Sequence, residues 1–401
     1  MTRHRRFTLL ALLAIAFSLL LTGCPRAGLP TEHTRFISVT GGGYHSLALD
    51  RTGQAWAWGH NAHGQIGDGT SDHRLVPTAV TMPPGVTFTT IAAGNYHSLA
   101  LDQNGRAWAW GRNSSGQIGD GTDDGDRVVP TAASMPPGVL FTAIAAGGSY
   151  SLALDRNGHA WAWGYNYYGQ IGDGTYLNVR VVPTATTMPP GITFIAIAAG
   201  AAHALALDQH GRAWAWGWNR DGQIGDGTHD NFRLVPTAPL MPSGTTFSTI
   251  AAGNYHSLAL DQNGHAWVWG SNPYGQAGDG TDDNLRLLPT ATQMPANVTF
   301  TAIAGGSWHA LALDQHGHAW VWGANNVGQA GDGTIGNRRL VPTAVTMAPG
   351  DAFAAVASGQ FHPLGLDRHG RAWGWGSNGF GQVGDGTHDN SRLVPTAVHM
   401  P

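Results

Sequence analysis

The chain has 401 residues, of which 58 are glycine, 16 are tryptophan, 42% are hydrophobic and only 11% are charged. This hydrophobic content excludes a disordered chain, and the length suits one large domain or two ordinary ones. The formal net charge is −4, arginine is the only basic residue besides histidine, and no extended basic run occurs, which argues against nucleic acid as the main partner.

The first residues have the pattern of a secretory signal peptide. Residues 2–6 are basic, and an apolar stretch from Phe7 to Leu21 follows, interrupted by Ser18. The stretch is short for a membrane span but has the length and charge order of a signal peptide. We therefore expect residues 1–23 to be a signal peptide.

Leu21-Thr22-Gly23-Cys24 ends this stretch and resembles the lipobox of bacterial lipoproteins, whose cysteine is lipidated and becomes the new N-terminus. Cys24 is the only cysteine of the chain, so it cannot form an internal disulfide. The resemblance implies that residues 24–35 are a lipidated tether, and that the protein is held on a membrane of the bacterial cell envelope. Residues 25–35 would span at most about 40 Å when extended. The alternative is a plain signal peptide that contains a cysteine.

The rest of the chain repeats one unit seven times. Residues 88–133 show it: FTTIAAG, HSLALD, AWAWG and RVVPTAA are four strand-like segments separated by glycine-rich turns. Four short strands in about 53 residues are typical of a propeller blade. We therefore predict an all-β, seven-bladed β-propeller over residues 36–401. The Trp-x-Trp-Gly element begins at Trp56, Trp108, Trp161, Trp214, Trp267, Trp320 and Trp373.

Alternation along the strands predicts how the blades pack. Trp108 and Trp110 share one face of a strand, and Leu99 and Leu101 share one face of its neighbour. We expect a blade that is bulky on one side and thin on the other, with bulky faces packed on thin ones around a closed ring. The Ala-Ala-Gly segment suits the crowded innermost strand, and the proline of Val-Pro-Thr suits an outer edge.

The sequence motifs AAGxxHSLALD, AWAWG and GQIGDGT resemble the repeat of the regulator of chromosome condensation family, whose members are seven-bladed propellers. The eukaryotic founder of that family is a nuclear nucleotide-exchange factor for a small GTPase and acts through loops and an inserted wedge. The even spacing here leaves no room for such a wedge. A bacterial relative, a secreted inhibitor of β-lactamases, binds an enzyme through one face of its ring, which fits an envelope location better.

Residues that recur in every blade are most simply part of the scaffold. Histidine occupies one position in six blades, with Tyr150 in the remaining one, and we expect a repeated hydrogen bond there and no metal site. A Gly-Asp-Gly-Thr motif and a later arginine also recur and indicate an ion pair or turn cap in each blade. The loop from Asp120 to Gly125 resembles part of a calcium loop but lacks the closing glutamate. The histidines are His45, His97, His203, His256, His309 and His362.

The residues that differ between blades lie in the loops after the first and third strands, which should emerge on the same face of the ring. The column just before the histidine and the residues after Trp-Gly are rich in aromatic side chains, which are typical of protein-binding hot spots and also stack on sugars. Some of these rings could instead pack onto their own loops. The predicted partner-binding residues are Tyr44, Tyr96, Tyr165, Tyr167, Tyr168, Trp218, Arg220, Tyr255, Tyr274, Trp308, Phe361 and Phe380.

We expect a monomeric, non-enzymatic binding scaffold that recognises a protein partner and needs no cofactor. An envelope glycan-binding protein or a carbohydrate-active enzyme is the alternative, for which Asp126 and Asp221 are the carboxylates that depart from the repeat. Nucleotide exchange on a GTPase ranks below both, because the leader sequence directs the chain away from the cytosol. The sequence shows no nucleophile elbow, phosphate loop or metal-ligand cluster.

Overall fold

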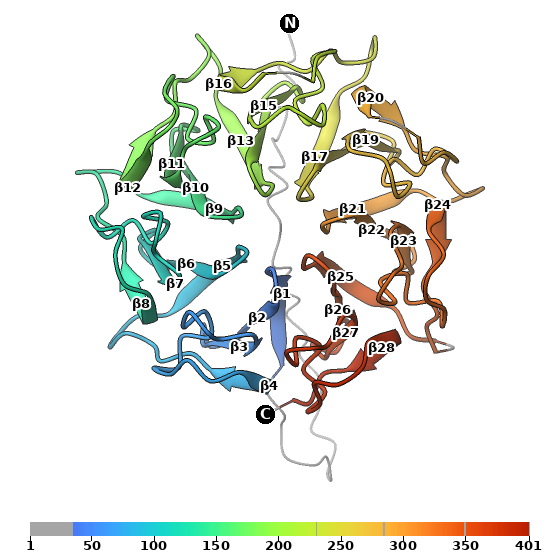
Figure 1. Cartoon of the computed structure of the whole chain (residues 1–401), viewed down its shortest axis with the longest axis horizontal. Coiled ribbons are helices and arrows are strands. Elements are labelled where there is room, and N and C mark those ends of the chain that lie inside the picture. Colours follow the sequence, from blue (N-terminus) through green and yellow to red (C-terminus); the bar gives the residue numbers. More distant parts are fainter. Residues whose placement is uncertain (1–34, 230, 284, 349, 401) are drawn as a thin grey trace, which may run out of the picture.

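A computed structural model describes residues 35–229, 231–283, 285–348 and 350–400. The expected signal peptide (1–23), Cys24 and nearly all of the expected tether lie outside the described residues. The described chain forms seven four-stranded antiparallel sheets arranged as a closed ring (Figure 1). The predicted seven-bladed propeller is therefore confirmed. In the part of the chain that the structure covers, no helix is long and apolar enough to cross a membrane.

Each repeat contributes one blade, with its four strands in chain order from the centre of the ring to the rim. The first strands are β1 (Phe36–Gly41), β5 (Phe88–Ala93), β9 (Phe141–Ala146), β13 (Phe194–Ala199), β17 (Phe247–Ala252), β21 (Phe300–Gly305) and β25 (Phe353–Ser358). The second strands are β2 (His45–Asp50), β6 (His97–Asp102), β10 (Tyr150–Asp155), β14 (His203–Asp208), β18 (His256–Asp261), β22 (His309–Asp314) and β26 (Pro363–Asp367). The third strands are β3 (Ala55–Gly59), β7 (Ala107–Gly111), β11 (Ala160–Tyr165), β15 (Ala213–Gly217), β19 (Ala266–Gly270), β23 (Ala319–Gly323) and β27 (Ala372–Gly376). The fourth strands are β4 (Arg74–Ala79), β8 (Arg127–Ala132), β12 (Val179–Ala185), β16 (Arg233–Thr237), β20 (Arg286–Ala291), β24 (Arg339–Ala344) and β28 (Arg392–Ala397).

The ring closes by packing of the seventh blade (β25–β28) against the first blade (β1–β4). Because the seven sheets keep the chain order, none of the described strands is exchanged between the first and last repeats. The main-chain N–H of Phe36 donates to Gly370 O at 2.9 Å, and that of Gln360 donates to Gly42 O at 3.0 Å. Repeat and blade therefore coincide.

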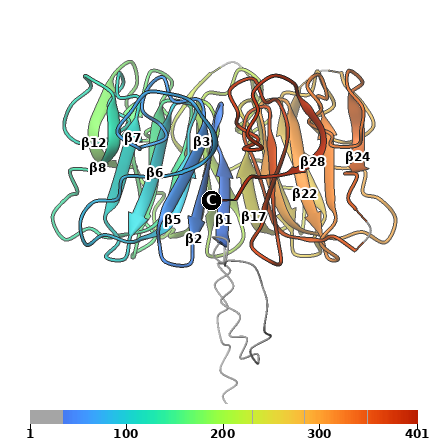
Figure 2. The same cartoon turned by 90° about the horizontal axis from the view of Figure 1, so that it is seen from below.

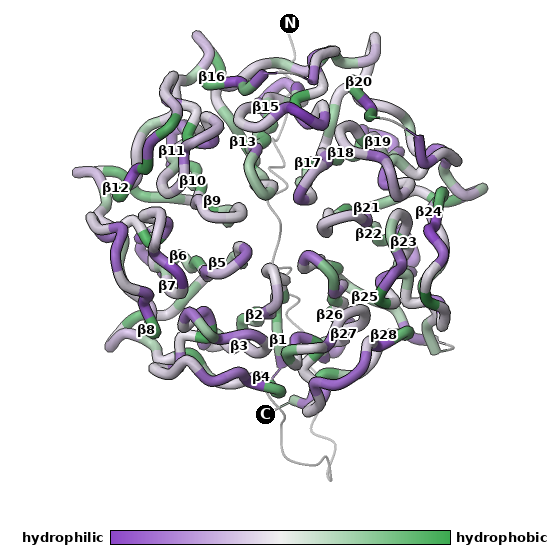
Figure 3. Tube along the Cα trace, viewed as in Figure 1, coloured by the Kyte–Doolittle hydropathy of each residue, from purple (hydrophilic) through white to green (hydrophobic). Residues whose placement is uncertain are grey.

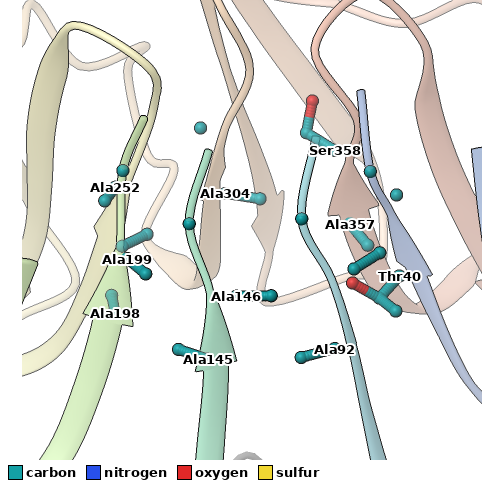
Figure 4. Close-up of a pocket in the computed structure, with 18 of the residues that line it drawn as sticks. Thr40, Ala92, Ala145, Ala146, Ala198, Ala199, Ala252, Ala304, Ala357 and Ser358 are labelled. Atoms are coloured by element: carbon teal, nitrogen blue, oxygen red, sulfur yellow. The ribbon is translucent and has the colours of Figure 1, made fainter. Parts of the chain in front are cut away.

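The first strands line a central pocket of about 330 Å³ with alanine and glycine, and with isoleucine at one position of most blades. Figure 4 shows Ala92, Ala145 and Ala198, each from a different blade, around this space. Seven first strands converge here, which favours small residues at most of these positions. This arrangement confirms the predicted place of the Ala-Ala-Gly segment, while the Val-Pro-Thr segments lie at the rim, where hydrophilic stretches gather along β4, β8 and β28 (Figure 3).

The packing between blades differs from the predicted match of a bulky face with a thin one. In the β6–β7 register, Leu99 lies opposite Ala109 and Ser98 lies opposite Trp110, so leucines and tryptophans occupy opposite faces of one sheet. Both faces therefore carry bulk. The tryptophan face of each blade packs on the leucine face of the blade before it, as Trp110 does on Leu47 and Leu49.

The Gly-Gln-Ile-Gly loop locks neighbouring blades together. Trp110 is fully buried, and its indole N–H donates to Gln65 O in the preceding blade at 2.9 Å. Gly67 has a φ of +79°, and a Cβ there would lie 2.7 Å from the indole nitrogen of Trp110. Only glycine tolerates both this backbone conformation and this close approach.

The ring has two flat faces, seen edge-on in Figure 2. We call one the loop face: it carries the loops that join first to second strands and third to fourth strands. The opposite linker face carries the turns between second and third strands and the linkers between blades. Because β1 runs from the linker face towards the loop face, the chain enters the propeller at Phe36 on the linker face.

Candidate interaction face

The two variable loops of each blade are joined by main-chain hydrogen bonds on the loop face. His60 N–H donates to Tyr44 O, and Arg112 N–H donates to Tyr96 O, both at 2.9 Å. These bonds place the residue before each repeated histidine beside the residue after Trp-Gly. The expectation that both loops share one face is therefore confirmed.

The aromatic side chains of the loop face gather into three clusters. Cluster I spans the seventh, first and second blades, with Tyr44 at its centre. The ring of Tyr44 lies 5.8 Å from Phe361, 5.4 Å from Phe380 and 6.5 Å from Tyr96, measured between centroids. Its members are Tyr44, His60, His63, His73, Tyr96, Phe361 and Phe380.

Three histidines of the first blade belong to cluster I, but their hydrogen bonds disfavour a metal site. His60 and His73 lie 4.8 Å apart between ring centroids. The Nδ1 atom of His73 accepts the main-chain N–H of Asn61, so Nε2 carries the proton of the neutral ring and has no lone pair for a metal. Burial, with the charges of His73 and His63, lowers the pKa of His60 to about 4.

Cluster II lies on the third and fourth blades. The rings of Tyr165 and Tyr167 stack with centroids 4.7 Å apart, and Tyr168 meets Trp218 edge-on at 4.4 Å. Burial, followed by the neighbouring tyrosines, raises the pKa of Tyr165 to about 12. The cluster consists of Tyr165, Tyr167, Tyr168, Trp218 and Phe232, with the guanidinium of Arg220 over the Trp218 ring.

Cluster III lies on the fifth and sixth blades. Tyr255 and Trp308 stack with centroids 4.3 Å apart, and Tyr274 lies 5.3 Å from Trp308. The guanidinium of Arg338 covers Tyr274 at 5.4 Å and pairs with Asp282. Tyrosine, tryptophan and arginine held in this way give a rigid surface with both apolar and polar contacts.

All twelve predicted residues fall into these clusters, but the sequence did not predict the clustering. Rings from both loop columns pack against each other, so most are half-buried, and Tyr167 is the most exposed at 42%. The prediction also missed a third column, the residue just before the repeated arginine. It contributes His73, Phe232 and Arg338, and its variation between repeats is the signal that could have identified it.

Most of the repeated histidines make the expected repeated hydrogen bond, and this bond joins neighbouring blades. His45 Nε2 lies 3.0 Å from Ser98 Oγ of the next blade, and Ser98 donates its own proton to Gln65 O at 2.8 Å. The hydroxyl proton is used in this second bond, so Nε2 must donate to Ser98. The same pair recurs as His97–Ser151, His203–Ser257 and His362–Ser46.

Where the serine is absent, the partner changes. The fourth blade has Ala204, and the preceding blade has Tyr150, whose hydroxyl reaches past the alanine to His203 O. The seventh blade has Pro363, and His309 pairs with Ser358 on the first strand instead. The sixth blade has Ala310, and neither ring nitrogen of His256 finds a hydrogen-bond partner among the described residues.

The recurring aspartate and arginine form an ion pair in every blade, as expected. Asp120 accepts Arg127 Nε at 2.8 Å and the hydroxyl of Thr122 at 2.8 Å. Burial raises the pKa of Asp120, but the bonds from Thr122 and Arg127 outweigh burial and hold that pKa below its ordinary value. The carboxylate that resembled a calcium ligand is thus occupied by protein donors.

The two carboxylates that depart from the repeat are held separately. Asp126 lies 2.8 Å from His63 Nδ1, and Asp221 accepts the indole N–H of Trp218 at 3.1 Å. They belong to loops two blades apart, with different partners. Across the described ranges, no group of three or more His, Cys, Asp or Glu side chains could hold a metal ion.

The fold and its repeated contacts define a seven-bladed propeller that presents aromatic clusters on one face. The RCC1-like domain matches residues 177–401, and the regulator of chromosome condensation (RCC1) repeat matches residues 52–101 and 104–154. The chain therefore belongs to the RCC1 family.

Relatives share most of the chain. The ultraviolet-B receptor UVR8 of Arabidopsis thaliana is 30% identical over 355 residues, which are 88% of this chain and 79% of that protein. The guanine nucleotide exchange factor SRM1 of Saccharomyces cerevisiae is 28% identical over a region that covers 77% of this chain and 73% of that protein. A crystal structure of Prp20p from Saccharomyces cerevisiae, described with its binding to Gsp1p and histones, has a TM-score of 0.76 at 26% identity and covers 88% of this chain and 87% of that one.

Proposed function

We propose that this protein is a membrane-anchored, non-enzymatic scaffold of the bacterial cell envelope that binds a protein partner through its loop face. One observation carries the proposal: the aromatic side chains that differ between otherwise uniform blades gather into three clusters on that face. Repeated residues serve the scaffold, whereas clustered Tyr, Trp and Arg provide the contacts that dominate protein interfaces.

The relatives favour binding over catalysis. UVR8 is named as a receptor, and Prp20p is described by its binding to Gsp1p and histones. The two carboxylates outside the repeated motifs are engaged by His63 and Trp218 in separate loops, which is a poor basis for acid–base chemistry on a sugar.

The envelope location rests on the leader sequence alone, since the relatives named above are eukaryotic. The chain enters the propeller on the linker face. If Cys24 carries lipid, the linker face is therefore turned towards the membrane and the loop face points away from it. That orientation leaves clusters I to III open to a partner.

Glycan binding is the second candidate. The stacked pairs Tyr165–Tyr167 and Tyr255–Trp308 are the observation that favours it, because sugars stack on such rings. Nucleotide exchange on a GTPase, the activity in the name of SRM1, would need the protein in a compartment that contains the GTPase.

A pull-down from envelope extract tests the proposal. The bait is the propeller, beside a triple variant with Tyr167, Tyr168 and Trp218 changed to Ala. A control variant changes Ile195 and Leu240, which are 53% and 59% exposed away from the clusters, to Ala. We expect one protein to be captured by the bait and the control and lost from the triple variant. Equal capture by all three, or capture of glycan alone, would contradict protein recognition by the loop face.

A further inference from the structure

The exposed charges of the propeller are divided between its two faces. The turns between second and third strands all have four residues, so their tips form a level ring on the linker face. No exposed carboxylate occurs in these turns. The exposed arginines of the tips are Arg51, Arg106, Arg156, Arg212, Arg368 and Arg371, of which Arg371 pairs with Asp367.

An aspartate ends each second strand, directly before the turn, but it lies inside the blade. These seven carboxylates are between 0 and 8% exposed. Asp102 is typical: its oxygens accept the main-chain N–H of Asn104 and Arg106 and the indole N–H of Trp108. A flat surface that approaches the linker face therefore meets arginine first. The linkers between blades add one carboxylate, Asp351.

The loop face has the opposite character. The loops between third and fourth strands expose more carboxylates than arginines, since Arg112, Arg220 and Arg338 are their only arginines that do not belong to the repeated ion pairs. The exposed carboxylates are Asp72, Asp123, Asp124, Asp126, Asp282, Asp283 and Asp389. The protein thus has an acidic rim on one face and basic tips on the other.

We infer that the linker face docks on an anionic phospholipid bilayer. Charge complementarity is the first argument, since arginine pairs well with lipid phosphate and remains charged at every physiological pH. The place where the chain enters is the second: Phe36 lies on the linker face, and residues 25–35 would hold that face within about 40 Å of a lipid on Cys24. The inference rests on the proposed anchoring and adds how the ring is oriented on the membrane.

When the linker face docks in this way, the loop face is turned away from the membrane. Each arginine near an anionic surface strengthens binding about fivefold, and the attraction fades over a Debye length of about 8 Å. The face would bind weakly by itself, and the lipid on Cys24 would supply the second attachment that stable anchoring needs.

Sedimentation with vesicles tests the inference. All strands and the contacts that close the ring lie within residues 36–398, so the propeller without residues 1–34 keeps its core. This propeller is mixed with vesicles of phosphatidylcholine alone, or of phosphatidylcholine with phosphatidylglycerol. We expect binding to the anionic vesicles only, with loss of binding as the salt concentration rises.

Two variants with equal charge change locate the binding face. Changing Arg51, Arg156 and Arg212 to Gln should lower the partition coefficient at least about tenfold. Changing Arg112, Arg220 and Arg338 to Gln on the loop face should leave it unchanged or raise it. An unchanged melting temperature shows that each variant is folded.

Equal binding to neutral vesicles, an equal effect of both variants, or no binding at all would overturn the inference. None of these results touches the proposed partner site, because capture of a protein by clusters I to III is tested with substitutions on the loop face. Equal capture of that protein by the bait and the triple variant would in turn overturn the proposed function and leave the vesicle result standing.

Discussion

Ser98 Oγ lies 3.0 Å from His45 Nε2 in the preceding blade and donates its own proton back to Gln65 O of that blade. One hydroxyl therefore links two blades through two hydrogen bonds. All the groups involved are buried, so losing the hydroxyl would leave the His45 N–H without an acceptor, whereas Gln65 O would keep the indole N–H of Trp110.

We predict that Ser98→Ala lowers the free energy of unfolding by about 1–3 kcal/mol, because the His45 N–H would lose its acceptor in a dry interface. Urea denaturation of the propeller measures this change. Ser134→Ala, at an exposed position, is the control and should change the stability by less than about 0.5 kcal/mol. An equal effect of both substitutions would show that the blade link contributes nothing.

The reverse substitution should stabilise the protein. His256 faces Ala310, where most other blades have serine, and its ring nitrogens lack partners among the described residues. Ala310→Ser would supply an acceptor for His256 and a donor for Gln276 O, and we expect about 1 kcal/mol of added stability. Ala204→Ser should give no such gain, because Tyr150 already spans that position. A destabilised Ala310→Ser variant would show that serine at this position does not form the hydrogen bond to His256.

Acid should unfold the propeller at a pH where its aspartates are still ionised. Burial, with repulsion between some neighbouring histidines, lowers the pKa of His45, His203, His309 and His362 to about 3 and of His97 and His256 to about 4. The unfolded chain takes up these protons near pH 6.5, so stability is complete above that pH and falls as the pH drops towards 4.

The slope of the free energy of unfolding against pH reports how many histidines take up a proton on unfolding. Each contributes up to about 1.4 kcal/mol per pH unit, and six contribute up to about 8 kcal/mol per pH unit. Melting temperatures between pH 7.5 and about 4.5 follow the loss. The double variant His97→Tyr with Ser151→Ala copies the Tyr150–Ala204 arrangement and should have a shallower slope by one proton. A melting temperature independent of pH over this window would contradict the account.

The seam between the first and last blades should tolerate no added volume. A Cβ on Gly41 would lie 2.4 Å from Gly359 N in the seventh blade, whereas a Cβ on Gly379 would meet nothing within 4 Å. We predict that Gly41→Ala costs more than about 1 kcal/mol and that Gly379→Ala is close to neutral. Chemical denaturation of both variants checks this. Equal stabilities would mean that the seam is loose.

Chelation should leave the protein unchanged. Asp120 and its counterparts already bind arginine and threonine, so a metal would have to displace these donors. We expect the same melting temperature with and without a chelator. A large drop after chelation would show that the aspartate loops hold an ion.

The sequence predicted the ring, the order of its strands and the side of each loop, because these follow from period-two alternation repeated at a fixed spacing. It could not predict that Tyr168 meets Trp218 or that Phe232 joins them, since such contacts depend on how separate loops fold over one another. The sequence also could not predict that Trp110 packs on Leu47, because the register between strands decides which residues share a face.

Photo-crosslinking in intact cells tests whether the loop face contacts a protein partner. A photoreactive amino acid replaces either Tyr167 in cluster II or Leu240 in the linker that follows β16 (Arg233–Thr237). The crosslinked products are identified by mass spectrometry. We predict that one protein is crosslinked repeatedly through position 167 and is missing from the products of position 240. Crosslinks to that protein from position 240 alone, or to no protein from position 167, would contradict recognition through the loop face.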